Sequence, residues 1–207
     1  MKNQLLIPLL TCLIGLGGPA CCQETGEQKK AAGQRNHALL SAGDQARFTR
    51  QDTLRGSITP ERAWWDLVYY DLRVQVDIDQ RTIGGSNIVY YRVLQPASRM
   101  QIDLQRPMEI HGVWQDGEKL PLAREGNAYF ISLRKPQQPG ALEAVEIQYG
   151  GTPREAVRAP WDGGFSWKKD RQGRPFVATS CQGLGASAWW PNKDHMYDEV
   201  DSMAIRV

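Results

Sequence analysis

The sequence predicts an all-β fold, either a sandwich or a barrel-like sheet. The first observation is the alternation of apolar and charged residues in YDLRVQVDI, residues 70–78, which is typical of a strand with one buried face. The second is the recurrence of similar short stretches, separated by turn signals such as Asp116-Gly117 and Gly150-Gly151. The third is that no stretch after Trp65 repeats with a helical period. Short strands joined by turns describe an all-β domain.

Residues 1–20 are predicted to be a secretory signal and not part of the fold. Lys2 precedes the apolar run LLIPLLTCLIGLGG, which is too short to cross a bilayer comfortably. Gly18 and Ala20 then supply small residues at the positions before a cleavage site at Cys21. We therefore expect an exported protein, whether periplasmic, an outer-membrane lipoprotein or secreted.

Cys21 is a candidate lipidation residue. GGPAC resembles a bacterial lipobox, in which the cysteine after the cleavage site carries lipid and anchors the protein to a membrane. Gly18 stands where leucine is usual, so ordinary cleavage that leaves Cys21 unmodified is the alternative. The sequence leaves both open.

A polar tether is predicted for residues 21–56, which are poor in aromatic residues and rich in Gln, Ala and Lys. The folded domain is then expected to span residues 57–207. It begins with a short helix in SITPERAWWD, where Thr59 can act as a cap, Pro60 suits the first helical position and Glu61 favours the first turn.

Further strands are expected along the rest of the chain, because apolar residues recur at alternate positions between turn signals. DQRTIGG turns the chain after the first strand. The expected strands are residues 86–94, 100–104, a pair on either side of Asp116-Gly117, 129–133 and 145–149, followed by a hairpin whose turn lies at 170–173.

Composition and charge restrict the classes of function. Hydrophobic residues make up 41% and charged residues 23% of the chain, close to the average of globular domains, so a core can form. The formal net charge of +2 gives no general reason to expect nucleic acid or an anionic membrane as a partner. One local exception is the cluster of Lys168, Lys169, Arg171 and Arg174 beside Trp167. It fits either a phosphate contact or a charged turn that keeps the hairpin soluble.

The sequence predicts no catalytic residue, metal ligand or cofactor site in this chain. The three histidines, His37, His111 and His195, are isolated from one another, and no His-Glu-x-x-His motif occurs. Cys181 is the only thiol in the predicted domain and is expected to be a buried small hydrophobe. The stretch GLGAS, residues 183–187, lacks the serine position and the strand-to-helix turn of a hydrolase elbow.

Two features near the end of the chain suggest binding. Large rings stand beside glycines at Trp161, Trp167, Trp189 and Trp190, and such rings suit either a recognition surface or the packing of a sheet corner. One hypothesis is therefore an exported β-sandwich module that binds glycan or protein through these aromatics. The second feature is Gln182, whose amide offers both donors and acceptors and whose neighbour Gly183 leaves its approach unobstructed.

The order of three motifs, YYDL with its following strands, APWDGGF and SCQGLGASAWWPNKD, resembles the N-terminal domain of the aminopeptidase N family of zinc metallopeptidases, the gluzincins. The likeness covers residues 64–207, and the CQGLGASAWWPNKD segment is its most specific part. The resemblance implies a saddle-shaped antiparallel β-sandwich packed against a thermolysin-like catalytic domain. It also implies that the zinc motif, the Gly-x-Met-Glu-Asn substrate motif and the catalytic tyrosine lie in that following domain.

The resemblance implies a role for Gln182. In the family, a Gln or Glu at this position projects into the S1 side of the active site and helps to hold the free α-amino group of the substrate. Cys181 and Ser180 match positions that support this strand, and Asp194 matches a structural Asp. The expected function is the N-terminal substrate-pocket domain of a zinc aminopeptidase, with peptide N-termini as substrate and the catalytic domain of the same polypeptide as partner.

The chain ends at MAIRV, before a catalytic domain. We therefore expect it to be inactive alone, with zinc bound in the catalytic domain of the parent enzyme. It is either part of a longer aminopeptidase or a separate protein that retains only the first domain. The glycan- or protein-binding module remains the alternative.

Overall fold

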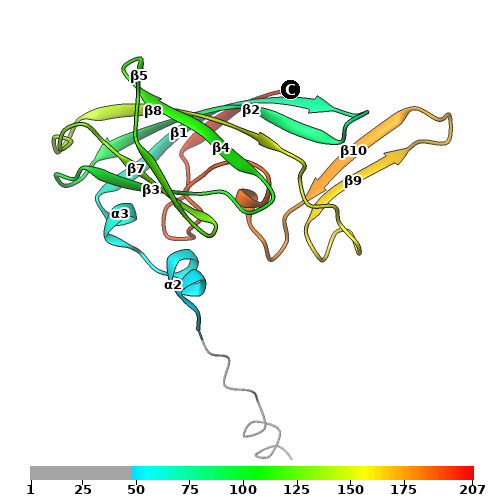
Figure 1. Cartoon of the computed structure of the whole chain (residues 1–207), viewed down its shortest axis with the longest axis horizontal. Coiled ribbons are helices and arrows are strands. Elements are labelled where there is room, and N and C mark those ends of the chain that lie inside the picture. The colour runs from blue at the N-terminus through cyan, green and yellow to red at the C-terminus, as the bar shows by residue number, and fades with distance from the viewer. Residues whose placement is uncertain (1–47) are drawn as a thin grey trace, which may run out of the picture. The chain divides into compact units, whose positions relative to one another are not determined.

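Residues 48–207, the part of the chain that the computed structural model describes, are built mainly from β-strands (Figure 1). This confirms the predicted β-rich class with several sheets. The predicted signal peptide, Cys21 and His37 lie outside the described residues. The strands are β1 Trp65–Asp77, β2 Thr82–Val93, β3 Arg99–Asp103, β4 Glu109–Gln115, β5 Glu118–Lys119, β6 Leu122–Glu125, β7 Ala128–Ser132, β8 Leu142–Gly151, β9 Gly164–Lys169, β10 Pro175–Ser180 and β11 Ser202–Arg206.

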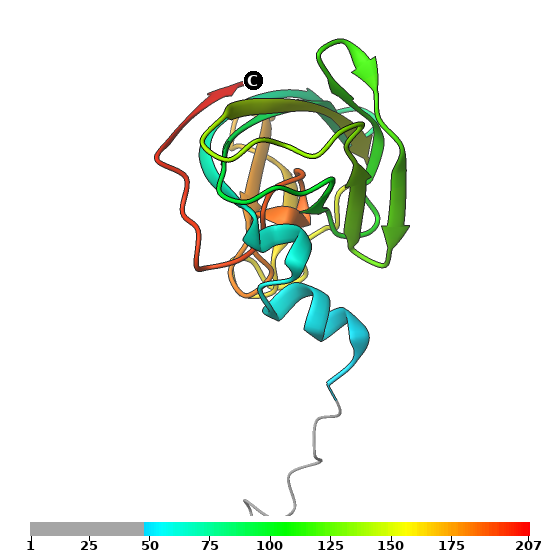
Figure 2. The same ribbon diagram turned by 90° about the vertical axis from the view of Figure 1, so that its left-hand side faces the viewer.

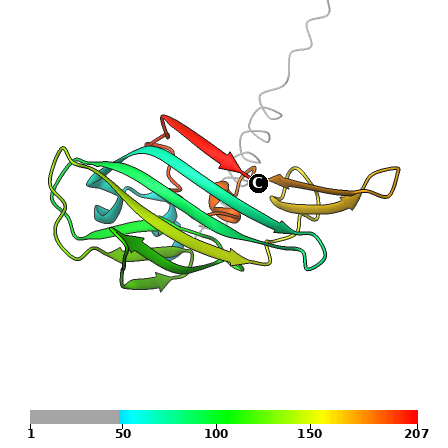
Figure 3. The ribbon, with the colours of Figure 1, turned by 90° about the horizontal axis from the view of Figure 1, so that it is seen from above.

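The strands form three sheets. The order in the largest is β11-β1-β2-β8-β4-β5, the second is β3-β7-β6, and β9 pairs with β10. Seen from above, β11, β1, β2 and β8 lie side by side, and the β9–β10 hairpin extends away from them (Figure 3). The two larger sheets share one core, and its fully buried members include Leu72, Val89, Ile102, Ile131 and Ile147. Removal of these side chains from water is the main force that holds the two sheets together.

A helix, α2, spans Arg50–Gly56, inside the range 21–56 that the sequence predicts as polar tether. Thr49 and Asp52 form a reciprocal capping box: Thr49 Oγ1 accepts from the Asp52 N–H at 3.2 Å, and the Asp52 carboxylate accepts from the Thr49 N–H at 2.7 Å. Leu54 is the one buried residue of the helix. One buried apolar residue in a helix of seven residues leaves no periodic signal in the sequence.

The predicted helix at SITPERAWWD is confirmed as α3, Pro60–Ala63, with Thr59 at its N-cap. The Thr59 hydroxyl does not cap the helix; it donates to Gln101 Oε1, in β3, at 2.8 Å. The Trp65 indole N–H donates to the carbonyl oxygen of Glu61 at 3.0 Å. Both contacts tie the helix to the strands, and α2 and α3 lie together on one side of the sheets (Figure 2).

The turn predicted at Asp116-Gly117 is confirmed, because both residues have positive φ, 53° and 79°, as a tight hairpin requires. The turn predicted to include Gly84 and Gly85 is shorter, since β2 already begins at Thr82. A Cβ on Gly85 would lie 1.9 Å from the carbonyl oxygen of Arg73 in β1. This glycine therefore permits close strand pairing and does not form the turn.

The prediction of a wholly antiparallel arrangement is wrong for β11, which pairs with β1 in parallel, from Tyr69 opposite Ser202 to Arg73 opposite Arg206. The chain reaches β11 through a long connection from β10, residues 181–201. No hairpin turn fixes the direction of such a strand. The alternation of apolar and polar residues in a strand of five residues does not show whether the strand runs parallel or antiparallel to its neighbour.

Four tyrosines lie in the core: Tyr70, Tyr91 and Tyr149 have exposed fractions of 3%, 0% and 2%, and Tyr129 has one of 3%. Burial raises the pKa of each phenol above its ordinary 10.0. The Tyr70 oxygen accepts from the Lys193 N–H at 3.0 Å, and the Tyr91 hydroxyl donates to Gln137 Oε1 at 3.2 Å. The Tyr149 hydroxyl has no hydrogen-bond partner among the described residues.

The free energy of unfolding should therefore fall as the pH rises above 10.0. A raised folded-state pKa means that the contribution of each phenol is fully present below the unfolded-state pKa of 10.0 and is lost as the pH rises towards the folded-state pKa. Each phenol should contribute a slope of about 1.4 kcal/mol per pH unit. Urea unfolding on both sides of pH 10 measures this slope.

The Y149F variant is the matched control, because it removes one ionising group without breaking a hydrogen bond. Its slope should be smaller than that of the wild type by about 1.4 kcal/mol per pH unit, the contribution of one phenol. Lys193, whose pKa burial lowers, titrates in the opposite sense and contributes equally to both proteins. Equal slopes in the two proteins would contradict the burial of an ionisable phenol at this position.

Candidate functional site

Gln182 lies on a tight turn directly after β10. The carbonyl oxygen of Cys181 accepts from the N–H of Leu184 at 3.1 Å and from that of Gly185 at 2.9 Å. Gly183 has a φ of 74°, a conformation that glycine adopts without strain. Gln182 is exposed, and its side chain makes no hydrogen bond within residues 48–207. Its amide is therefore available to a ligand.

Two side chains from distant parts of the chain hold this turn. The Arg55 guanidinium, in α2, donates to the carbonyl oxygens of Gly183 at 3.0 Å and Leu184 at 2.8 Å. Gln105 Nε2 donates to the Leu184 oxygen at 2.6 Å. Sequence reasoning missed Arg55 because it falls in the predicted tether; the Thr-x-x-Asp capping pattern at Thr49 was the available signal.

Gly185 brings the turn against Asp194. A Cβ on Gly185 would lie 2.6 Å from Asp194 Oδ1, so only glycine permits this approach. The Ser187 hydroxyl, in the short 3-10 helix η1 at Ala186–Ala188, donates to Asp194 Oδ2 at 2.5 Å. Arg55 Nε lies 3.9 Å from the same oxygen. Asp194 thus links the turn, η1 and α2.

The segment after η1 pairs with both larger sheets. Asn192 and Asp103, at the end of β3, exchange backbone hydrogen bonds of 2.9 and 3.1 Å. Asn192 Nδ2 donates to the Trp190 oxygen at 3.0 Å, and Asn87 Nδ2, in β2, donates to the Pro191 oxygen at 2.9 Å. These contacts satisfy the backbone of a segment that is buried without being a strand.

Lys193 is a buried cation, and its side chain has no exposed surface. The ammonium group pairs with Asp198, donates to the Trp65 carbonyl oxygen at 2.6 Å and lies 3.9 Å from the centre of the Trp65 ring. Burial lowers the pKa of Lys193, and the bond to Asp198 opposes this shift. The Asp198 carboxylate also accepts from the Leu67 N–H at 3.2 Å.

Arg62, in α3, is a second buried cation. It donates to the carbonyl oxygens of Leu54 at 2.7 Å and Ser57 at 3.0 Å, and its guanidinium pairs with the Asp103 carboxylate. Burial raises the pKa of Asp103, and the positive charge of Arg62 opposes that shift. The Asp194 N–H also donates to Asp103, at 3.3 Å. Arg62 therefore connects α2, β3 and the WWPNKD segment, residues 189–194.

The tryptophans divide between core and surface. Trp190 is buried and packs edge-on against Tyr70, with ring centres 4.9 Å apart. Trp189 and Trp167 are half-buried, and both pack against the ring of Phe165. Of the tryptophans that the sequence singled out as binding or packing residues, only Trp161 is well exposed, at 69%. The structure thus assigns packing to Trp190 and partial packing to Trp189 and Trp167.

The described residues contain no group of three or more His, Cys, Asp or Glu side chains placed to hold a metal ion. His111 is exposed on β4. His195 Nδ1 accepts from the Tyr197 N–H at 3.3 Å, and His195 Nε2 lies 3.3 Å from the Gly56 carbonyl oxygen. Cys181 is a free thiol that is half-buried, not buried as expected, because it begins the surface turn. No helix in this part of the chain has the length and apolar character needed to cross a membrane.

A cavity of about 690 Å³ borders the WWPNKD segment. Its apolar lining includes Leu67, Tyr70 and Trp190, and Asp194 contributes a charge. Gly183 is among the lining residues, whereas Gln182 is not. Gln182 therefore stands next to this cavity and does not line it.

Several solved structures of zinc metallopeptidases share this fold. An M1 zinc metallopeptidase from Deinococcus radiodurans aligns with a TM-score of 0.55 at 18% identity, over 69% of this chain and 32% of that one. Native leukotriene A4 hydrolase from yeast aligns with a TM-score of 0.56 at 16% identity, over 76% of this chain and 26% of that one. A two-domain M1 zinc metallopeptidase bound to L-arginine aligns with a TM-score of 0.54 at 20% identity, over 70% of this chain and 32% of that one.

The chain thus spans a third or less of the length of these structures, and the likeness falls on their N-terminal part. At such identities the likeness establishes a common fold, and it confirms at that level the resemblance inferred from the motifs. No protein-family model and no curated protein matches the sequence.

The Arg62–Asp103 pair is expected to be essential for stability. Arg62→Met leaves the Asp103 carboxylate buried without its main partner, which should lower the free energy of unfolding by about 3–5 kcal/mol. Adding Asp103→Asn removes the uncompensated charge and keeps the shape, so the double variant should be more stable than Arg62→Met alone. Urea unfolding of the wild type, of Arg62→Met, of Asp103→Asn and of the double variant measures both effects. If the double variant lost as much free energy of unfolding as the two single variants lose together, the proposed coupling between Arg62 and Asp103 would be contradicted.

Proposed function

We propose that residues 57–207 are the N-terminal substrate-pocket domain of a zinc aminopeptidase, which removes N-terminal amino acids from peptides, and that Gln182 recognises the free α-amino group of the substrate. The observation that carries this proposal is an exposed amide without a hydrogen-bond partner among residues 48–207, on a turn whose carbonyl oxygens accept from Arg55 and Gln105. The fold shared with the N-terminal part of M1 zinc metallopeptidases supports it. The resemblance further implies a saddle-shaped sandwich.

The amide chemistry suits an ammonium ligand. Gln182 Oε1 accepts hydrogen bonds, and a bond from an ammonium group is charge-assisted, worth about 1.5–3 kcal/mol when it is shielded from water. A peptide with a blocked N-terminus offers no such donor. A related M1 zinc metallopeptidase has been solved with a Tyr-Ser-Ala substrate, which supports peptide N-termini as the substrate class.

The residues described here do not fit a zinc site, since they hold no suitable group of ligands. We therefore assign no catalytic step to residues 48–207. In the proposal, zinc and the reacting groups belong to a catalytic domain of the same polypeptide, against which this domain packs. Export, through a signal peptide at residues 1–20, and lipid attachment at Cys21 are further parts of the proposal that rest on the sequence.

The glycan- or protein-binding module is not proposed. That hypothesis requires several exposed rings on one surface, and the rings of Trp190, Trp189 and Trp167 are used wholly or partly in packing. Trp161 alone does not form an aromatic platform.

The role of Gln182 is tested in the protein encoded by the complete reading frame that contains this chain. Q182A should lower kcat/KM for substrates with a free N-terminus by about tenfold to a hundredfold, because one charge-assisted bond is lost. Hydrolysis of aminoacyl anilides and of their N-acetylated counterparts gives the comparison, and N-acetylated substrates should not distinguish Q182A from the wild type. Q182E keeps the acceptor and should retain activity.

Gln138→Ala, at an exposed glutamine in the loop before β8, is the matched control and should leave both activities unchanged. If kcat/KM for free and blocked substrates changed equally in Q182A, the loss would not come from the α-amino group. An unchanged kcat/KM in Q182A would remove this residue from the proposed role.

A further inference from the structure

The β9–β10 hairpin carries the basic cluster that stood out in the sequence, and the proposed function does not use it. The two strands pair from Gly164 opposite Ser180 to Lys169 opposite Pro175, as a separate two-stranded sheet. The hairpin extends away from the larger sheets (Figures 1 and 3), and residues 171–176 at its tip are exposed.

The tip of the hairpin is a rigid turn built around Asp170. Its carboxylate accepts from the N–H groups of Gln172 and Arg174, both at 2.9 Å, and from Arg174 Nε at 2.7 Å. The bond from the Arg174 N–H holds the pKa of Asp170 below its ordinary value. Gly173 has a φ of 81°, which completes the turn. The backbone that carries the basic residues therefore has a defined turn conformation.

Three cations of the cluster have no counter-charge among residues 48–207. Asp170, the only acidic residue of the hairpin, is already paired with Arg174. Lys168, Lys169 and Arg171 are exposed, and no ion pair with any of them occurs among the described residues. The net charge of +2 describes the whole chain, whereas this surface concentrates positive charge at one projecting point.

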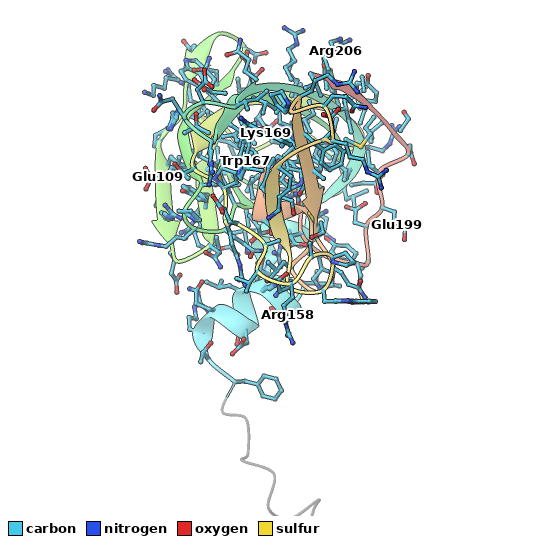
Figure 4. All side chains as sticks on the ribbon, turned by 90° about the vertical axis from the view of Figure 1, so that its right-hand side faces the viewer. Glu109, Arg158, Trp167, Lys169, Glu199 and Arg206 are labelled. Atoms are coloured by element: carbon cyan, nitrogen blue, oxygen red, sulfur yellow. The ribbon has the colours of Figure 1, made fainter. Side chains whose placement is uncertain are left out.

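The two faces of the hairpin differ. Trp167 and Val177 stand opposite each other and pack towards the core. Lys168 and Phe176 also stand opposite each other, and they occupy the other face because neighbouring residues of a strand point to opposite sides. Phe176 is 56% exposed. Figure 4 views the protein from the hairpin side, with Trp167 and Lys169 labelled.

We propose that this hairpin tip is an interaction surface for a lipid bilayer that contains anionic phospholipids. Lys168, on the face of Phe176, and Arg171, at the turn, would contact headgroup phosphates, while the Phe176 ring would enter the interface between headgroups and acyl chains. Lys169, at the tip end of β9 on the other face, would add to the attraction by its positive charge. Lysines near an anionic bilayer each strengthen binding, and an exposed aromatic ring beside them adds apolar burial.

The exposed phenylalanine favours a bilayer over a purely ionic partner such as nucleic acid or an acidic protein. Nucleic acid needs a groove or a row of cations, usually with rings that can stack on several bases. Here one ring and one lysine share a narrow, outward face of a projecting hairpin. That geometry suits shallow insertion into a planar surface.

The proposal is tested by sedimentation of the purified chain with vesicles, using a Cys21→Ser background so that no lipid is attached to the protein. The chain should bind vesicles of phosphatidylcholine mixed with phosphatidylglycerol more tightly than vesicles of phosphatidylcholine alone, and added salt should weaken the binding. Lys168→Gln with Lys169→Gln should weaken it by about 30-fold. Phe176→Ser should weaken it by about tenfold.

The matched control is Lys119→Gln with Lys135→Gln, which removes the same charge from exposed positions outside the hairpin and should change binding much less. Thermal unfolding of each variant establishes that it is folded. Equal binding of the hairpin variants and the control, or no binding of the unsubstituted chain to anionic vesicles, would overturn the proposal. So would binding to DNA or to an acidic protein that equals the vesicle binding and does not depend on Phe176.

Discussion

The position of the WWPNKD segment depends on two buried cations, Arg62 and Lys193. Each is removed from water, and removal of an unpaired charge costs several kcal/mol. Each is therefore paired with a carboxylate, Asp103 or Asp198, and also donates to backbone carbonyl oxygens. The contacts of Arg62 join α2, α3, β3 and the segment, and those of Lys193 join the segment to β1. The cations thus specify how the segment sits on the core, in addition to the apolar burial that stabilises the domain.

The same arrangement fixes the turn that carries the candidate site. The segment fixes Asp194, which contacts Gly185, and α2 supplies Arg55 to the carbonyl oxygens of the same turn. Gln182 is exposed on this turn, and its side chain makes no hydrogen bond within residues 48–207. A recognition group on a rigid support loses little conformational entropy when a ligand binds, which is the usual advantage of a preorganised site. The stability of the domain and the proposed recognition of an α-amino group therefore rest on the same contacts.

The strands that follow a regular alternation could be predicted from the sequence, because burial of one face leaves a period of two. Gln182 could be proposed as well, since the sequence alone shows an amide side chain next to a glycine in the motif that resembles the aminopeptidase family. Three features could not be predicted. Arg62 and Lys193 would be taken as solvated, because only their tertiary partners make burial tolerable. Helix α2 has one buried leucine and no periodic pattern. The parallel direction of β11 is set by a long connection and not by a turn.

The central claim is that Gln182 contacts the α-amino group of a bound substrate. A crystal structure of the protein encoded by the complete reading frame, with bestatin bound as in the yeast hydrolase structure, tests it most directly. The account predicts that Gln182 Oε1 lies within about 3.2 Å of the free amino group of the inhibitor, a hydrogen-bond distance. A structure in which another residue holds the amino group and the Gln182 side chain points into solvent would contradict it.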